Sequence, residues 1–190
     1  MARPRSEDKR NAILAAATQA IARQGLGAPT AKIAQLAGVA EGTLFTYFKN
    51  KADLVNQLYL ELKSELREVM LADYPKSRNA KSQTQHVWDN YVTWGAAHPR
   101  KRKVLAQLGV SDKISEKTRT AGMVGFTDFH RLVEECLASG AMRGPSVDFV
   151  RAMLGSLAET TMDFMIRDPA NADTYRESGF DALWSAIAKK

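Results

Sequence analysis

The stretch that decides the fold is residues 30–51, TAKIAQLAGVAEGTLFTYFKNK. Its apolar residues fall at helical spacing on either side of residues 38–40, which predicts two short helices joined by a tight turn. Gly38 can adopt the left-handed backbone angles that such a turn requires. The small side chains of Ala34 and Ala37 let two helices cross closely. These features together predict a helix-turn-helix.

A small hydrophobic core should hold this motif together, shared with the helix that precedes it. The apolar residues that face inward at helical spacing are Ile33, Leu36, Val39, Leu44 and Phe48. We expect Thr30 to be the N-cap of the first short helix, because threonine is favoured at that position. The second short helix should begin at about residue 41.

Helical periodicity continues on both sides of the stretch, and no alternating strand pattern appears. The expected helices cover residues 7–24, 31–37, 41–47, 50–73, 82–98, 100–109, 112–139, 146–166 and 171–188. The expected fold is all-α with about nine helices: a three-helix N-terminal module joined by a long helix to a helical body. The polar loop around Pro75 is the expected boundary. It gives a module at 7–66 and a body at 80–188.

Positive charge is concentrated in the first quarter of the chain. The net charge is +6, and residues 1–51 carry eight Lys or Arg against three Asp or Glu. A basic segment beside a nearly neutral one suits a polyanion-binding module on a neutral body. A solvated positive face with no partner would give the same counts, so charge alone leaves both interpretations open.

Length and composition are those of a soluble globular protein with a core of its own. The chain has 190 residues, 45% hydrophobic and 25% charged, and a single cysteine, Cys136, so no intramolecular disulfide is expected. No apolar region follows the basic N-terminus, and no run reaches the ~20 apolar residues of a membrane span. We therefore expect a cytoplasmic protein that spans no membrane.

Sequence motifs of familiar enzymes are missing. No Gly-rich phosphate loop, paired-cysteine or paired-histidine metal spacing, or serine elbow is present. We therefore expect no enzyme activity, no catalytic residue, no metal and no cofactor. Two alternative interpretations of the chain are an enzyme without these motifs and a helical adaptor whose basic N-terminal segment is incidental. Strong salt dependence of duplex binding would exclude the adaptor, because phosphate contacts release counterions.

At residues 30–51 the sequence resembles the TetR family of transcriptional regulators. The likeness rests on Thr30, Ile33-Ala34, Ala37-Gly38-Val39, Gly42-Thr43-Leu44-Phe45, Tyr47-Phe48-Lys49, Lys51 and Leu54. It covers about residues 7–66, with the helix-turn-helix at about 30–49. It implies a sequence-specific DNA-binding regulator whose recognition helix enters the major groove. It also implies a ligand-responsive repressor that leaves a near-palindromic operator when an effector binds, and an activator of the same family fits equally well.

The resemblance also implies which residues meet the operator, a double-stranded DNA. Backbone phosphates are expected at Thr30, Tyr47 and Lys51, and base edges at the exposed threonines of the recognition helix. Arg3 and Arg5 lie on an arm that can enter the minor groove. The expected DNA-binding residues are Arg5, Thr30, Lys32, Glu41, Gly42, Thr43, Phe45, Thr46, Tyr47 and Lys51.

Two positions depart from the family pattern. The family often has serine where this chain has Ala40, so the usual cap of the recognition helix is missing. It often has a small or basic residue where this chain has Glu41. We expect Glu41 either to cap the helix, where a carboxylate suits the helix dipole, or to accept a hydrogen bond from cytosine.

For the body, the resemblance implies a homodimer and a small-molecule effector. Aromatic and Met residues at helical spacing suit an apolar or aromatic effector, although plain core residues would show the same spacing. The candidate pocket residues are Trp88, Tyr91, Trp94, Met123, Phe126, His130, Met153 and Met162. The dimer is expected through the last two helices, at Phe149, Leu157, Phe164, Phe180, Leu183, Trp184 and Ile187.

Overall fold

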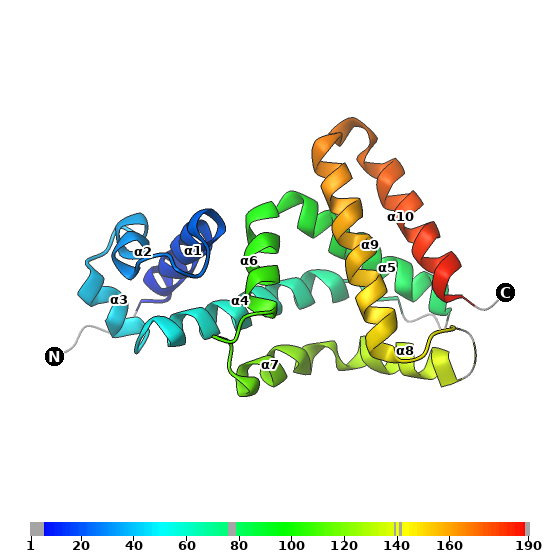
Figure 1. Ribbon diagram of the computed structural model, residues 1–190, viewed down its shortest axis with the longest axis horizontal. Helices are drawn as coiled ribbons and strands as arrows, with labels where there is room; N and C mark the ends of the chain where they lie inside the picture. The colour runs from blue at the N-terminus through cyan, green and yellow to red at the C-terminus, as the bar shows by residue number, and fades with distance from the viewer. Residues whose placement is uncertain (1–5, 76–78, 139, 141, 189–190) are drawn as a thin grey trace. The chain divides into compact units, whose positions relative to one another are not determined.

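The computed structural model describes residues 6–75, 79–138, 140 and 142–188, except for the side chains of 128–130 and 132. Every regular element in this part of the chain is a helix, which confirms the all-α prediction (Figure 1). The first helices are α1 Glu7–Gln24, α2 Thr30–Leu36, α3 Glu41–Tyr47, α4 Lys51–Leu71 and α5 Ala80–Ala97. They are followed by α6 Pro99–Gly109, α7 Glu116–Met123, α8 Thr127–Ala138, α9 Val147–Arg167 and α10 Ala172–Ile187.

The expected helix over 112–139 is wrong, because the structure breaks it in two. A 3-10 turn, η1 Val124–Phe126, separates α7 from α8. Gly125 lies within this turn, and a Cβ there would overlap the guanidinium end of Arg67. A larger residue at the break would therefore displace the end of Arg67, and the described chain has ten α-helices instead of nine.

By packing, the chain divides into two compact units, which we describe separately. Unit 1 is the described part of Met1–Ser64 together with Pro99–Met123, and unit 2 is Glu65–His98 together with the described part of Val124–Lys190. The chain passes from one unit to the other inside α4, at residues 64–65. The module at 7–66 and the body at 80–188 remain predictions about function, since α6 and α7 pack with unit 1.

Unit 1 is built around one hydrophobic cluster contributed by α1, α2, α3, α4 and α6. Ile33, Leu44 and Phe48 are completely buried, as the sequence predicts. Leu36 and Val39 are half-buried and pack against the same cluster. Burying each such side chain contributes about 1.5–3 kcal/mol, so tertiary packing holds these seven-residue helices that would be marginal alone.

Unit 2 is centred on Trp88 of α5, which is completely buried. Its indole ring packs against Phe180 of α10, and its Nε1–H donates to the backbone oxygen of Arg176 at 2.9 Å. Ser146 is the N-cap of α9, and its hydroxyl accepts from the amide of Phe149. Helices α5, α9 and α10 pack against one another around this indole.

Arg143 closes the C-terminal end of α10. Its guanidinium donates to the backbone oxygens of Ser185 and Ala186, at 2.8 Å and 3.0 Å. Its backbone amide donates to the oxygen of Ile187. The last carbonyls of a helix have no partner within the helix, so one arginine satisfies three of them here. Across the described residues, no helix is long and apolar enough to cross a membrane.

Candidate nucleic-acid interface

The turn between α2 and α3 has the geometry that Gly38 predicts. Gly38 adopts a φ of 68°, a left-handed value that side chains disfavour. The amide of Val39 then donates to the carbonyl of Ala34, which ends α2 and turns the chain toward α3. Figure 1 shows the two short helices at the N-terminal end of the chain. This pair is a helix-turn-helix with α3 as the recognition helix.

The first residues of α2 and α3 are joined by one short hydrogen bond. The hydroxyl of Thr30 donates to Oε1 of Glu41 at 2.6 Å. The ends of these two helices correct two expectations. Thr30 is the first helical residue and not the N-cap, which is Pro29, and Glu41 does not cap α3, which has no side-chain cap. Without a serine at position 40, the carboxylate turns to the neighbouring helix.

This bond places a negative charge where phosphates of bound DNA are expected. Replacing Glu41 with glutamine removes the charge and keeps an oxygen that accepts from Thr30. We expect Glu41→Gln to tighten binding to every duplex by about fivefold, because one repulsion of about 1 kcal/mol disappears. Titration of labelled duplexes of different sequence measures it. Weaker binding together with lost preference at one base pair would instead identify Glu41 as a base reader.

Tyr47, at the end of α3, is held by the start of α1. Its phenolic oxygen accepts a hydrogen bond from the backbone amide of Ser6 at 3.0 Å. Since the oxygen acts as acceptor there, its own proton remains to be donated to a phosphate oxygen. The side chain is half-buried, which limits the directions in which the hydroxyl can point. The contact therefore positions the donor before DNA arrives.

The start of α4 is fixed by a reciprocal pair of hydrogen bonds. Oδ1 of Asn50 accepts from the amide of Asp53, and Oδ2 of Asp53 accepts from the amide of Lys49, both at 2.8 Å. The first bond satisfies an amide that a helix start leaves without a partner, and the second ties the residue before the helix to its first turn. Lys51, the first residue of α4, is consequently presented from a rigid helix end.

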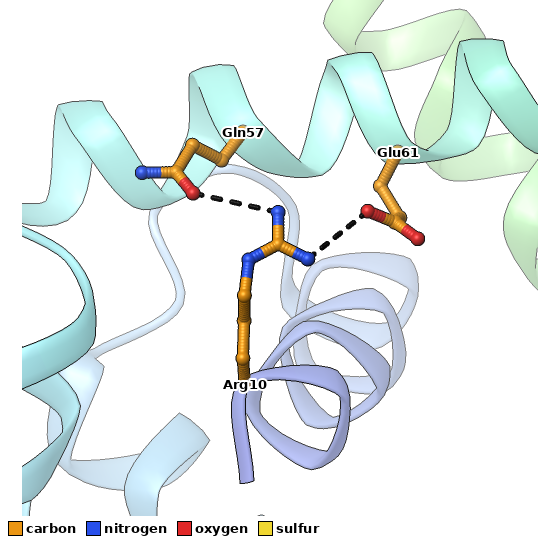
Figure 2. Close-up of polar contacts among 3 residues, drawn as sticks. All are labelled: Arg10, Gln57 and Glu61. Atoms are coloured by element: carbon orange, nitrogen blue, oxygen red, sulfur yellow. Dashed lines mark hydrogen bonds and ion pairs between the residues drawn. The ribbon is translucent and has the colours of Figure 1, made fainter. Parts of the chain in front are cut away.

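Polar contacts also join the first turns of α1 to α4 (Figure 2). Nη1 of Arg10 lies 3.2 Å from Oε2 of Glu61, and its Nη2 donates to Oε1 of Gln57 at 3.5 Å. Gln57 in turn donates to Oδ1 of Asp53 at 3.0 Å. The Arg10 and Glu61 side chains are 28% and 48% exposed, so the pair contributes about 1 kcal/mol or less. It ties the first turns of α1 to the middle of α4.

The remaining DNA-binding candidates lie on or near exposed parts of α2 and α3. Phe45 is 42% exposed, Thr43 is half-buried, and the hydroxyl of Thr46 donates to the carbonyl of Thr43 at 2.7 Å. Lys32 is hydrogen-bonded to Gln35 on its own helix. Arg3 and Arg5 lie outside the described residues. The structure therefore joins Thr30 to Glu41, fixes Tyr47 against Ser6, places Lys51 at the start of α4 and leaves Phe45 open to solvent.

A substitution at Gly42 should affect the stability of the protein and its affinity for DNA in opposite directions. A Cβ at this position would meet no described atom within 4 Å, and the helix has ordinary backbone angles there. Gly42→Ala should raise the free energy of unfolding by up to about 1 kcal/mol, because alanine favours helix. If the DNA backbone approaches Gly42 closely, the same change weakens duplex binding by about tenfold. Thermal unfolding and duplex titration measure the two effects, and unchanged affinity would show that DNA stays away from Gly42.

The candidate pocket residues of the body are mostly inside its core. Trp88 and Met162 are completely buried, and Trp94 and Phe126 are 3% and 6% exposed. Tyr91 and Met153 are half-buried. Met123 belongs to unit 1, and the side chain of His130 lies outside the described residues.

Unit 2 contains an open hollow of about 460 Å³. Of the candidate pocket residues, Trp94 lines this hollow. The other lining residues are Val69, Asp89, Asn90, Thr93, Ala97, His98 and Arg176. Asp89 pairs with Arg176 at 3.4 Å; burial raises the pKa of Asp89, and the guanidinium partly opposes that rise. The rings of Trp94 and His98 stack with centroids 5.8 Å apart. The four-residue spacing of Asn90, Trp94 and His98 is a sequence signal for this face that the aromatic pattern alone misses.

The dimer candidates on α9 and α10 divide into exposed and buried groups. Phe149 and Phe164 are 49% and 43% exposed, and Leu157 and Trp184 are half-buried. Phe180, Leu183 and Ile187 are at most 2% exposed. These three are corrected to core residues, because α10 turns them toward α5 and α9 and no surface remains for a partner.

Comparison with known proteins shows which family of proteins this chain resembles. The family model described as "Bacterial regulatory proteins, tetR family" matches residues 13–58. The fatty acid metabolism regulator protein of Bacillus subtilis (strain 168) is 29% identical over 165 residues, covering 82% of this chain and 83% of the relative.

Solved structures share the whole fold. A TetR-family transcription regulator from Shewanella sp. PV-4 is 27% identical, with a TM-score of 0.84 over 98% of this chain and 100% of that one. The transcriptional regulator FadR from Bacillus subtilis, solved in complex with stearoyl-CoA, is 24% identical, with a TM-score of 0.71 over 93% and 98% of the two chains. The helix-turn-helix, the helical body and these matches agree: the chain belongs to the TetR family and is a DNA-binding transcriptional regulator.

Proposed function

We propose that this regulator is a ligand-responsive repressor of fatty acid metabolism. It binds a near-palindromic operator as a homodimer and leaves the operator when a long-chain acyl-CoA binds unit 2. The observation that carries the proposal is the match to the fatty acid metabolism regulator, because it extends over 82% of this chain. It therefore includes the body as well as the reading head, by which we mean helices α1 to α3. A match to the reading head alone would carry no information about the effector.

The DNA-binding half of the proposal rests on groups whose positions are set in the absence of DNA. The phenol of Tyr47 is held by Ser6, and the start of α4 is held by the Asn50 and Asp53 bonds. Groups that are already ordered lose less conformational entropy on binding. We propose that Tyr47 and Lys51 contact phosphates, and that Thr43, Phe45 and Thr46 face base edges.

The effector half rests on chemistry that a body of this kind can supply. The FadR structure from Bacillus subtilis contains stearoyl-CoA. In this chain α5 and α9 bring Trp88 and Met162 into the interior of unit 2, and methionine is unbranched enough to move aside for a hydrocarbon chain. Each buried CH₂ group contributes about 0.8 kcal/mol, so an acyl chain would provide most of the affinity.

Helix α4 provides the covalent link between effector and operator. Its first fourteen residues belong to unit 1 and its last seven to unit 2. A ligand that binds two arrangements of α4 with different affinity shifts the population toward the one it prefers. We propose that acyl-CoA favours an arrangement that holds the two reading heads of a dimer at the wrong spacing for the operator.

The dimer itself would form through α9 and α10. Phe149 and Phe164 leave apolar area exposed on α9, and monomeric proteins seldom leave such surface open. A two-fold axis would bring the same face of each copy together. Two reading heads related by that axis read two half-sites, which is the reason to expect a near-palindrome.

The test selects random duplexes with the purified protein, sequences those retained, and then adds ligand to the complex. We expect a near-palindromic motif whose affinity falls about 10- to 100-fold with saturating stearoyl-CoA, the usual range of allosteric coupling. Coenzyme A alone and stearate alone should have little effect. Release by coenzyme A alone would contradict an acyl-chain effector, and retained binding with all three would contradict acyl-CoA control while leaving DNA binding intact.

A further inference from the structure

The loop between α6 and α7, residues 110–115, is fixed against α4 within unit 1. Asn56 of α4 makes two bonds to it: its side-chain nitrogen donates to the carbonyl of Lys113 at 2.9 Å, and its oxygen accepts from the amide of Ser115 at 3.0 Å. The side chain of Ile114 is 3% exposed and belongs to the hydrophobic cluster of unit 1. The loop is therefore anchored on both sides of Lys113.

The base of the loop is held as well. The guanidinium of Arg119 donates to the carbonyls of Gly109 and Ser111, and the hydroxyl of Ser111 accepts from the amide of Lys113 at 3.1 Å. A loop fixed by these five hydrogen bonds and a buried isoleucine is held firmly, whereas connecting loops are ordinarily the most mobile parts of a domain. Its one cationic side chain, Lys113, remains exposed.

This anchoring brings Lys113 close to the start of α4. Lys51 lies five residues before Asn56, on the same helix. Burial lowers the pKa of Lys51, and the positive charge of Lys113 lowers it further. Within the described part of the chain, neither lysine forms an ion pair with a carboxylate. Two lysines held together without an acid are stabilised when an anion binds between them.

We propose that Lys113 and Lys51 together bind one backbone phosphate of duplex DNA. The DNA interface then extends beyond the helix-turn-helix to the loop between α6 and α7. The proposal rests on the DNA-binding function of the chain and is independent of the effector. The proposal also explains the bonds of Asn56. They hold Lys113 at a fixed distance from α4, the helix that carries Lys51.

The test compares Lys113→Ala with Lys117→Ala. Lys117 is an exposed lysine four residues further along, on α7, so both variants lose one exposed positive charge. On the selected operator we expect Lys113→Ala to weaken binding about fivefold to tenfold, and Lys117→Ala less than twofold. The slope of log affinity against log salt should fall by about 0.9 for each half-site in Lys113→Ala alone. Lys113→Arg should retain most of the affinity.

A double variant tests whether the phosphate is shared. If Lys51 and Lys113 bind the same phosphate, Lys51→Ala with Lys113→Ala should weaken binding by clearly less or more than the product of the single effects, as coupled residues do. Equal losses in Lys113→Ala and Lys117→Ala would mean long-range charge only and would overturn the proposal. Strictly multiplicative effects would overturn the shared site. Unchanged thermal unfolding of Lys113→Ala is expected, because its side chain is exposed.

Discussion

The double variant Tyr47→Phe, Lys51→Ala should bind every duplex at least about 100-fold more weakly than the parent protein. Each change removes one donor to a phosphate, and a charge-assisted hydrogen bond contributes about 1.5–3 kcal/mol. Phosphates carry no sequence information, so the loss should be similar for operator and random duplexes. Fluorescence titration of both duplexes over a range of salt concentrations measures it, and the salt slope should become shallower.

A matched control removes the same chemistry from unit 2. Tyr175→Phe with Lys81→Ala deletes a phenolic oxygen and an exposed lysine on α10 and α5, outside the helix-turn-helix and the start of α4. We expect this control to bind duplexes within about twofold of the parent. If Tyr47→Phe, Lys51→Ala changes only the preferred sequence and not the affinity for random DNA, these residues read bases and the phosphate assignment is wrong.

Gly179→Ala should lower the free energy of unfolding of the protein by about 2 kcal/mol. A Cβ at this position of α10 would overlap the hydroxyl of Thr161 on α9 and lie 2.7 Å from Cζ2 of Trp88. Trp88 is completely buried and Thr161 is 6% exposed, so neither can move aside cheaply. Overpacking of this kind typically costs about 1–3 kcal/mol, which exceeds the gain from placing alanine in a helix.

The neighbouring Ser178→Ala is the control for this change. Ser178 is exposed on the same helix, so the substitution makes no new contact and slightly improves helix propensity. Urea unfolding followed by tryptophan fluorescence compares the two variants, since Trp88 and Trp94 both report on unit 2. A Gly179→Ala protein as stable as Ser178→Ala would mean that α10 lies further from α5 and α9 than the structure places it.

The helix-turn-helix and its core could be predicted from residues 30–51 because both depend on local chemistry. The turn requires a left-handed residue, and Gly38 supplies it with a φ of 68°. Helical spacing turns Ile33, Leu44 and Phe48 inward, and all three are completely buried. Such features are decided by neighbours three to four residues away, which a sequence displays directly.

The polar contacts of the candidate DNA interface could not be predicted from local sequence patterns. The bonds of Glu41 to Thr30 and of Tyr47 to Ser6 join residues 11 and 41 positions apart. A glutamate at a helix start is equally compatible with capping, base reading or a bond to another helix. Only the crossing of α2 and α3, which brings the two helix starts together, decides among them for the free protein.

The sequence by itself determined the all-α class, the reading head and the family, because helical periodicity and turn chemistry are local properties. The tertiary structure alone decided which face of α10 is buried, where the helix after residue 116 breaks, and that Asn56 holds Lys113 beside the start of α4. Each of these depends on which distant surfaces meet. Phe180 and Trp184 are both aromatic residues on one helix, yet only Phe180 is fully enclosed, because α5 and α9 cover its side.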